Sequence, residues 1–379
     1  MKRDRLRLLA ATIFGLLWPV CIPASLALPL LIARARTRAG AFLIPFLYVL
    51  AGSRGLPHGT AVFFGAGASV WLGAALWLAA ATLAALPFLV FYQKDAGHRK
   101  AAGIGLALIL WALSPVGFIH PITGLGDVLP GSGLMGILII FAAWLAYAVY
   151  LPRIPVFFII PAILAVQPAF IPADKLPEDL IGVDTHYGKL ASGNTIFFDQ
   201  YMRLIDVRDR ALHAKPLTLT VMPETVIGQL TQPAYNLIAP GANILDWHGS
   251  LMLVGAEIQH GNQYLNVLVP LGADLPPLVQ HTPVPVSMWA PFSGKGAVAA
   301  PFSAPSKITW HGKTIEAAIC YEQLLTVPML WITASRPNIL IAASNLWWAR
   351  DTSIPGLEHA AMLSWSRLMG AKLIESRNL

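Results

Sequence analysis

The stretch "AAICYEQLL", residues 317–325, ends an apolar run with a cysteine and follows it at once with a tyrosine and a glutamate. A short apolar run of this kind is typical of a buried strand. Cys320 and Cys21 are the two cysteines of the chain, and they cannot provide a disulfide framework. From residue type alone, Cys320 is either a small hydrophobe of the core or a nucleophile at a strand end.

Two further apolar runs also end in polar residues. "LTLTVMPETVIG" (217–228) carries Glu224 directly after a strand-like run, and "NILIAASNLWWARD" (338–351) carries Asn345. Active sites of α/β sheets gather just beyond strand ends. A carboxylate with a raised pKa can accept the proton of a thiol. The pattern predicts that Glu224 and Cys320 pair in a site, whereas the alternative makes Glu224 a surface acid and Cys320 a core residue.

The C-terminal half of the chain, residues 172–379, has the texture of an α/β domain. Short strand-like runs alternate with stretches that mix apolar and charged residues as amphipathic helices do. The predicted strands are 217–222, 251–258, 264–271, 307–320 and 338–344, and the predicted helices are 196–214 and 357–370.

The N-terminal part, residues 1–171, has the composition of a membrane protein. Only 12% of the whole chain is charged, against about 25% in an average soluble domain. Residues 1–171 hold 12 Lys and Arg but only three acids. This positive charge lies in short loops between apolar runs, where it sets membrane orientation. The excess of basic residues therefore does not indicate a nucleic-acid partner.

Six runs are apolar enough to be candidate spans, and basic clusters orient them. A bilayer needs about 20 mostly apolar residues per helix. Placing the basic loops in the cytoplasm predicts a multi-pass protein of the bacterial inner membrane with residues 172–379 in the periplasm. Pro19 and Pro23 break the first run, which predicts a bent hairpin, and no signal-peptide cleavage site is recognisable. The candidate runs are 8–33, 40–52, 66–92, 101–120, 134–150 and 154–171.

The order "PE", "ICYE" and "N-x-x-W" after successive apolar strands resembles the carbon-nitrogen hydrolase (nitrilase) superfamily. With membrane spans in front, the chain resembles the membrane branch that contains apolipoprotein N-acyltransferase. Over essentially its whole length it is similar to a family of shorter relatives, the TraB conjugal-transfer proteins of plasmids. This resemblance implies a nitrilase-like αββα sandwich behind a transmembrane helical bundle.

The resemblance also implies a thiol mechanism without a cofactor. Glu224 would be the general base, Cys320 the nucleophile of a thioester acyl-enzyme, and Glu322 an assisting acid with Tyr321 beside it. The implied partner is an acylated lipid or amide substrate at the membrane surface. The alternative implied by the resemblance is a non-catalytic membrane component that supports conjugation through contacts with conjugation-apparatus proteins.

Two departures from the family bear on activity. In "PVPVSMWAPFSGK" (283–295) the slot of the family's lysine falls on Val286, and the slot of its later acid falls on Gly294. Lys295 is the nearby ammonium that can take the lysine's role. In the alternative interpretation, Lys295 is a solvated lysine on a turn. The chain also stops at Leu379, where the family continues. The resemblance therefore predicts that the last strands are missing and that a sheet edge is left exposed or covered by a partner.

Three residues after the last predicted strand are candidates for substrate binding. Asn345, Trp347 and Trp348 would line an acyl pocket, or the tryptophans would anchor the domain at the lipid interface. "DTHY" (184–187) offers two metal-ligand types but no partner cluster, so no metal site is predicted. No G-x-S-x-G elbow surrounds a serine, so the sequence does not support a serine hydrolase.

Overall fold

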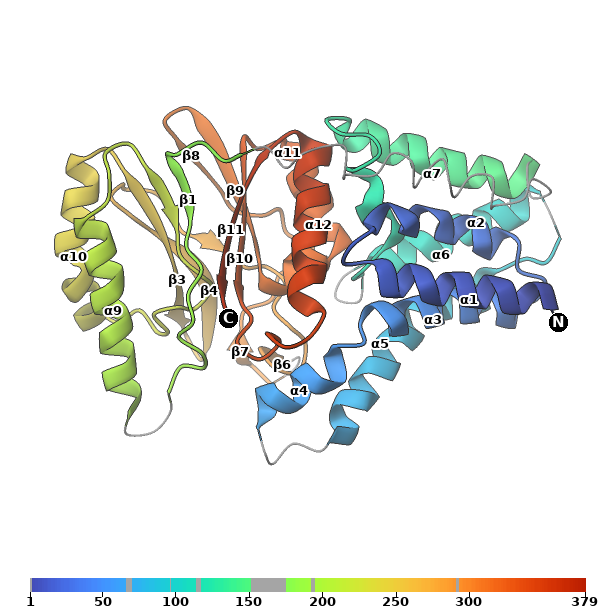
Figure 1. Cartoon of the computed structure of the whole chain (residues 1–379), viewed down its shortest axis with the longest axis horizontal. Helices are drawn as coiled ribbons and strands as arrows, with labels where there is room; N and C mark the ends of the chain where they lie inside the picture. The colour runs from blue at the N-terminus through green and yellow to red at the C-terminus, as the bar shows by residue number, and fades with distance from the viewer. Residues whose placement is uncertain are drawn as a thin grey trace. The chain divides into compact units, whose positions relative to one another are not determined.

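The computed structural model divides the chain into two compact units (Figure 1). The helical unit comprises Met1–Ala173, Leu324–Arg336 and Asp351–Gly370, and the α/β unit comprises Asp174–Gln323, Pro337–Arg350 and Ala371–Leu379. The helical unit thus includes two segments from the C-terminal half of the sequence. The structure describes residues 2–65, 70–95, 97–113, 117–150, 175–191, 195–290 and 293–379.

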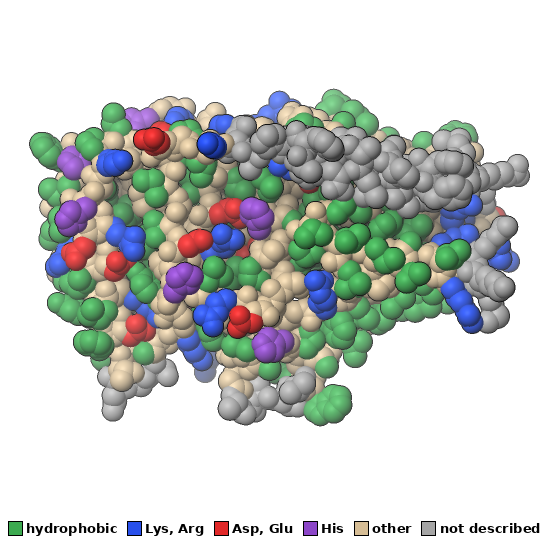
Figure 2. Space-filling view, in the orientation of Figure 1, with side chains coloured by type: hydrophobic (Ala, Val, Ile, Leu, Met, Phe, Trp, Pro, Cys, Tyr) green, Lys and Arg blue, Asp and Glu red, His purple; other side chains and the backbone are tan. Residues whose placement is uncertain are grey.

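The described part of the helical unit consists mainly of helices. Its elements are α1 (Lys2–Leu17), η1 (Ile22–Ala27), α2 (Leu28–Ala33), α3 (Arg38–Gly52), α4 (Leu56–Phe64), α5 (Val70–Phe91), α6 (His98–Ala112), η2 (Pro121–Leu125), α7 (Gly133–Tyr150), α11 (Thr326–Ser335) and α12 (Ile354–Met369). On the face drawn in Figure 2 this unit shows mainly hydrophobic side chains, whereas acidic, basic and histidine side chains are spread over the α/β unit.

Two described helices are long and apolar enough to cross a membrane, Trp71–Phe91 and Gly133–Tyr150. They coincide with the predicted runs 66–92 and 134–150. A third span is possible by length if α3 and α4, bent by 51° at their junction, are taken together. The predicted run 8–33 is broken between α1 and η1, where Pro19 lies, and the two halves contact each other. The run 154–171 lies outside the described residues.

Polar contacts fix α12 within the helical unit. The guanidinium of Arg367 donates to the buried carboxylate of Asp127 at 2.5 Å. The hydroxyl of Ser364 donates to the carbonyl of Thr123 at 2.6 Å. These contacts link the loop between α6 and α7 to a helix more than two hundred residues further along the chain. They explain why α12 clusters with the N-terminal helices despite its place in the sequence.

The α/β unit contains two sheets. In one, the strand order is β1-β2-β3-β4-β7-β6 with β5 paired to β4, and in the other it is β11-β10-β9-β8. The strands are β1 (Leu180–Gly182), β2 (Leu219–Val221), β3 (Leu251–His260), β4 (Gln263–Leu271), β5 (Leu278–Val279), β6 (Trp289–Ala290), β7 (Lys295–Ala297), β8 (Lys307–Trp310), β9 (Lys313–Ile319), β10 (Ile339–Asn345) and β11 (Lys372–Asn378).

Two hydrophobic cores set the order of layers in this unit (Figure 1). Helices α9 (Ile196–Leu212) and α10 (Gln232–Trp247) pack on one face of the larger sheet through a core that includes Val207 and Ile238. The second core lies between the sheets and contains residues of both, such as Val221 and Ile341. The predicted α/β class is confirmed. Helices α11 and α12, which follow β9 and β10 in the sequence, belong to the helical unit.

Three local details differ from the sequence prediction. The predicted strand 307–320 is a hairpin, β8 and β9, because His311 and Gly312 adopt positive φ and turn the chain. Helix α10 was not predicted, since Pro240 and Gly241 lie inside it. The edge of β11 is covered in part by the chain itself: Thr185 exchanges backbone hydrogen bonds of 2.8 Å with Arg377 and Leu379.

Candidate functional site

The ends of two strands from different sheets bring Glu224 and Cys320 together. Glu224 follows β2 of the larger sheet, and Cys320 follows β9 of the smaller one. The Cys320 thiol hydrogen-bonds to the Glu224 carboxyl. Cys320 has a φ of 53°, and Thr225, directly after Glu224, has a φ of 47°. Non-glycine residues in this left-handed region cost about 1–3 kcal/mol each and gather at functional sites.

The carboxyl of Glu224 is buried at 2% exposure and accepts hydrogen bonds on both oxygens. The side-chain amide of Asn266 donates to Oε1 at 2.6 Å, and the backbone N–H of Asn345 donates to Oε2 at 2.9 Å. Burial raises the pKa of Glu224 to about 7, and hydrogen bonds from Cys320, Asn266 and Asn345 partly offset that rise. A carboxyl with this pKa can take up and release a proton near neutral pH.

The turn that carries Glu224 lies directly on the backbone of β3. A Cβ placed on Gly255 would lie 2.0 Å from the carbonyl oxygen of Pro223, 2.5 Å from the backbone nitrogen of Thr225 and 2.7 Å from the carbonyl carbon of Glu224. Only glycine permits this approach. The position of the Glu224 carboxyl therefore depends on a residue in the middle of a neighbouring strand.

Two neutral amides lie beside Glu224 and the Cys320 turn. Asn266 on β4 donates to both Glu224 and the Gln280 side chain, the latter at 2.9 Å. Gln280 is buried and donates to the carbonyl of Ile319, the residue before Cys320, at 2.9 Å. Val286, the predicted lysine slot, is instead 58% exposed in a turn. Gln280 thus lies against the Cys320 turn, a neighbour that the sequence analysis did not identify.

Glu322 holds the turn that contains Cys320. Its Oε1 accepts from the backbone N–H groups of His281 and Thr282, at 2.8 and 3.0 Å, and its Oε2 accepts from that of Ile319 at 3.1 Å. Burial raises its pKa to about 7 against the effect of these three donors. Its bonds join the Cys320 turn to the loop after β5, which gives it a positioning role.

The end of β10 is tied to the ends of β2 and β11. The Asn345 side chain donates to the Thr225 hydroxyl at 2.8 Å and accepts from the Asn378 amide at 2.8 Å. The indole of Trp348 donates to the Asn345 carbonyl at 3.1 Å. Asn345, predicted to bind substrate, thus directs both its backbone and its side chain into the protein around Glu224.

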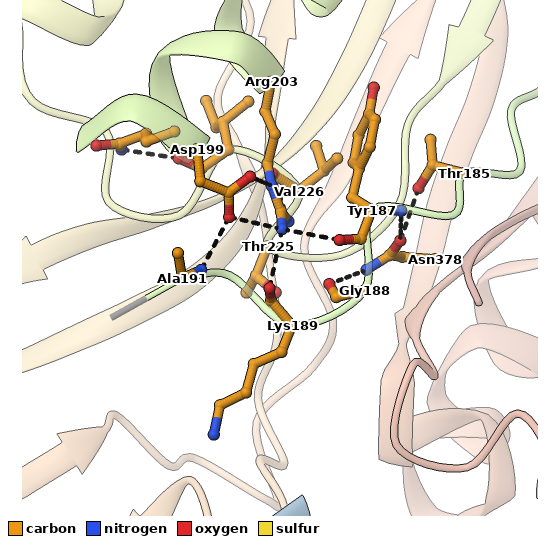
Figure 3. Close-up of polar contacts among 12 residues, drawn as sticks. Thr185, Tyr187, Gly188, Lys189, Ala191, Asp199, Arg203, Thr225, Val226 and Asn378 are labelled. Atoms are coloured by element: carbon orange, nitrogen blue, oxygen red, sulfur yellow. Dashed lines mark hydrogen bonds and ion pairs between the residues drawn. The ribbon is translucent and has the colours of Figure 1, made fainter. Parts of the chain in front are cut away.

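A buried arginine, which the sequence analysis did not identify, fixes the loop that contains Tyr187 and Lys189. Arg203 on α9 is 2% exposed and forms a two-pronged ion pair with Asp199, at 3.0 and 3.1 Å. It also donates to the carbonyls of Tyr187, Lys189 and Val226 (Figure 3). The available signal was an Asp and an Arg four residues apart on an amphipathic helix, which is also the pattern of an ordinary surface pair.

The remaining predicted residues lie in different surroundings. Lys295 is on β7 with its side chain exposed, and no described contact joins it to Glu224 or Cys320. Tyr321 is partly buried, and burial raises the pKa of its hydroxyl. Trp347 is partly buried beneath the ammonium of Lys189. Asp184 of the "DTHY" stretch is paired with Arg377 at 3.1 Å.

Two curated proteins are similar to this chain over its full length. It is 30% identical to the probable conjugal transfer protein TraB of Sinorhizobium fredii over 396 aligned residues, which cover 100% of both proteins. It is also 30% identical to the conjugal transfer protein TraB of Agrobacterium fabrum over 414 aligned residues, which cover 100% of this chain and 94% of that protein. No family model matches the sequence.

Solved structures of nitrilase-superfamily proteins are distant matches. A mutant amidase of this superfamily from Nesterenkonia AN1 covers 54% of this chain and 78% of its own, with 15% identity and a TM-score of 0.37. A CN-hydrolase superfamily protein from Xanthomonas campestris covers 52% of this chain and 74% of its own, with 10% identity and a TM-score of 0.34. The assignment of the candidate site therefore rests on the hydrogen bonds and burial within this chain.

Proposed function

Because this chain belongs to the family of TraB conjugal transfer proteins, we propose that it is a membrane-bound thiol enzyme of that family, an acyltransferase or amidase. The observation that carries this proposal is the contact between the Cys320 thiol and the buried Glu224 carboxyl, whose pKa is raised to about 7. A thiol beside a base at a strained strand end is the arrangement that nucleophilic catalysis requires.

The first chemical step uses these two residues. Glu224 takes the proton of Cys320, and the thiolate attacks the carbonyl carbon of an ester or amide. The leaving group departs with a proton returned by Glu224, which leaves a thioester on Cys320. An amine or water then attacks the thioester with Glu224 again as base, and the thiol is regenerated. The substrate class proposed is an acylated lipid or amide at the membrane surface.

The location follows from the apolar helices and the basic loops of the sequence. Two described helices meet the length and composition of membrane spans. Lys and Arg outnumber acids in residues 1–171, and such residues accumulate in cytoplasmic loops. We place the chain in the bacterial inner membrane as a multi-pass protein, with the α/β unit on the periplasmic side.

A second candidate is a non-catalytic component that supports conjugation through conjugation-apparatus proteins. One observation favours it: the described side chains that contact Glu224 and the Cys320 turn include the neutral amides of Asn266 and Gln280 and no lysine. A thiolate is stabilised by a neighbouring cation, and neutral amides supply less of that effect.

The decisive experiment is acylation of the purified full chain in detergent. An activated ester, p-nitrophenyl acetate, should leave one acetyl group on Cys320, detected by intact mass and peptide mapping. Cys320→Ala should lose the adduct, Cys21→Ala should keep it, and Glu224→Gln should form it about 100-fold or more slowly, as expected for loss of a general base.

The same variants separate the two candidates in cells. If Cys320 acylates and Cys320→Ser lowers conjugation frequency, the enzymatic proposal holds in its biological setting. A wild-type chain that forms no adduct, with conjugation unaffected by Cys320→Ser, would leave the non-catalytic candidate.

A further inference from the structure

We propose that Lys189 and Trp347 form an anion-binding wall beside the Cys320–Glu224 pair, so that the substrate carries a negatively charged group close to the carbonyl that is attacked. This inference rests on the proposed thiol chemistry and names a property of its substrate. It assigns a positive charge to a site whose innermost polar neighbours, Asn266 and Gln280, are neutral.

The backbone around Lys189 is held in place from both sides. The guanidinium of buried Arg203 donates to the Lys189 carbonyl at 3.2 Å and to the Tyr187 carbonyl at 3.3 Å. The buried side chain of Asn378 accepts from the N–H of Tyr187 at 2.9 Å and donates to the carbonyl of Gly188 at 2.9 Å. Lys189 therefore extends from a defined backbone position, away from the Arg203 cluster, as Figure 3 shows.

The ammonium of Lys189 lies over an aromatic ring. Its Nζ is 5.5 Å from the centroid of the Trp347 ring, within the range of a cation–π contact. The Lys189 side chain is exposed, and no carboxylate among the described residues lies within ion-pair distance of it. An indole face orients an ammonium without neutralising it. The N–H donors of Lys189 therefore remain free to bind an anion.

This wall adjoins the catalytic carboxyl through a short stretch of chain. Trp347 follows Asn345 by two residues, and the N–H of Asn345 donates to Glu224 at 2.9 Å. The same Asn378 that holds the Lys189 loop also donates to the Asn345 side chain at 2.8 Å. One hydrogen-bonded network thus positions both the general base and the ammonium. An exposed ammonium near a reacting centre changes the rate of approach of a charged reagent by several-fold at low salt.

The test compares two alkylating reagents of nearly equal size that differ in charge. Iodoacetate is an anion and iodoacetamide is neutral, and their second-order rates on Cys320 are measured with the full chain in detergent at low salt. Lys189→Gln should slow iodoacetate about threefold to tenfold and leave iodoacetamide unchanged. Lys189→Arg should retain the wild-type ratio of the two rates, and added salt should reduce the wild-type preference.

Lys215→Gln is the matched control, because Lys215 is also an exposed lysine of this unit but precedes β2, whereas Glu224 follows that strand. An equal effect of Lys189→Gln on both reagents, no effect on either, or the same selective effect in Lys215→Gln would overturn the inference. A wild-type Cys320 that reacts with neither reagent would instead refute the thiol chemistry, so the two failures are distinguishable.

Discussion

Replacement of Gly255 by alanine tests whether backbone packing on β3 positions the catalytic carboxyl. The added Cβ would lie 2.0 Å from the Pro223 carbonyl oxygen, whereas real Cβ contacts essentially never fall below 3.0 Å. The turn that carries Glu224 must therefore retreat by about 1 Å, since strand β3 is paired on both sides and is the less mobile partner.

A shift of that size is larger than the tolerance of the bonds to Glu224. The contacts from Asn266 and from the N–H of Asn345 are 2.6 and 2.9 Å long, and a further 1 Å or so removes the second from hydrogen-bond range. Overpacking of this kind costs about 1–3 kcal/mol, or a fall of about 2–10 °C in the thermal midpoint for a unit of this size. A displacement of about 1 Å at a catalytic group costs about 100-fold in rate.

The assay measures the thermal midpoint and the rate of Cys320 acetylation by p-nitrophenyl acetate for wild type and Gly255→Ala. Gly356→Ala in α12 is the control, because the nearest atom to its new Cβ is Pro19 Cβ at an ordinary 3.4 Å. Alanine at a helical glycine should leave the rate unchanged and hold or raise the midpoint. Wild-type rate and midpoint in Gly255→Ala would refute the reasoning that this close approach places Glu224.

Two further predictions concern the proton and the missing ammonium. Glu224 must be ionised to act as a base, and its pKa is raised to about 7. The rate of Cys320 alkylation by iodoacetamide should therefore rise about tenfold per pH unit below pH 7 and level off above it. In a stopped-flow pH series, Glu224→Gln should lack this inflection, and an inflection that persists in the variant would exclude Glu224 as the titrating group. Gln280→Lys places an ammonium beside the Cys320 turn and should raise alkylation at pH 7 about tenfold through a lower thiol pKa. Val286→Lys, at an exposed position, should not. Equal rates in both variants would count against Gln280 as a position from which a cation acts on Cys320.

Much of the α/β unit was predictable because its signals are local. The runs "LMLVGAEI" and "NILIAAS" are apolar and rich in strand formers, and they form β3 and β10 nearly as predicted. Helix α10 was not predictable in the same way. Its interior proline and glycine are local breakers, but Gly241 lies where a side chain would meet Ala211 of α9, so the helix is selected by packing against its neighbour.

The residues of the candidate site likewise fall into those with a local sequence signal and those recognised only by their tertiary contacts. Glu224, Cys320 and Asn345 were found as candidates because each follows an apolar strand, a feature visible in a few consecutive residues. Arg203 and Gln280 carry no such signal, since a helical Arg four residues from an Asp and a lone Gln in a loop occur on ordinary surfaces. Their importance arises from burial against groups that are distant in the sequence.

By itself, the sequence determined the apolar helices, the strand periodicity and the chemistry available at strand ends, because these depend on side chains a few positions apart. Only the tertiary structure decided that Glu224 and Cys320, from two different sheets, share a hydrogen bond, and that an amide rather than an ammonium lies beside them. The physical reason is that desolvation and hydrogen-bond partners, which set a pKa, are properties of the packed interior and not of the local chain.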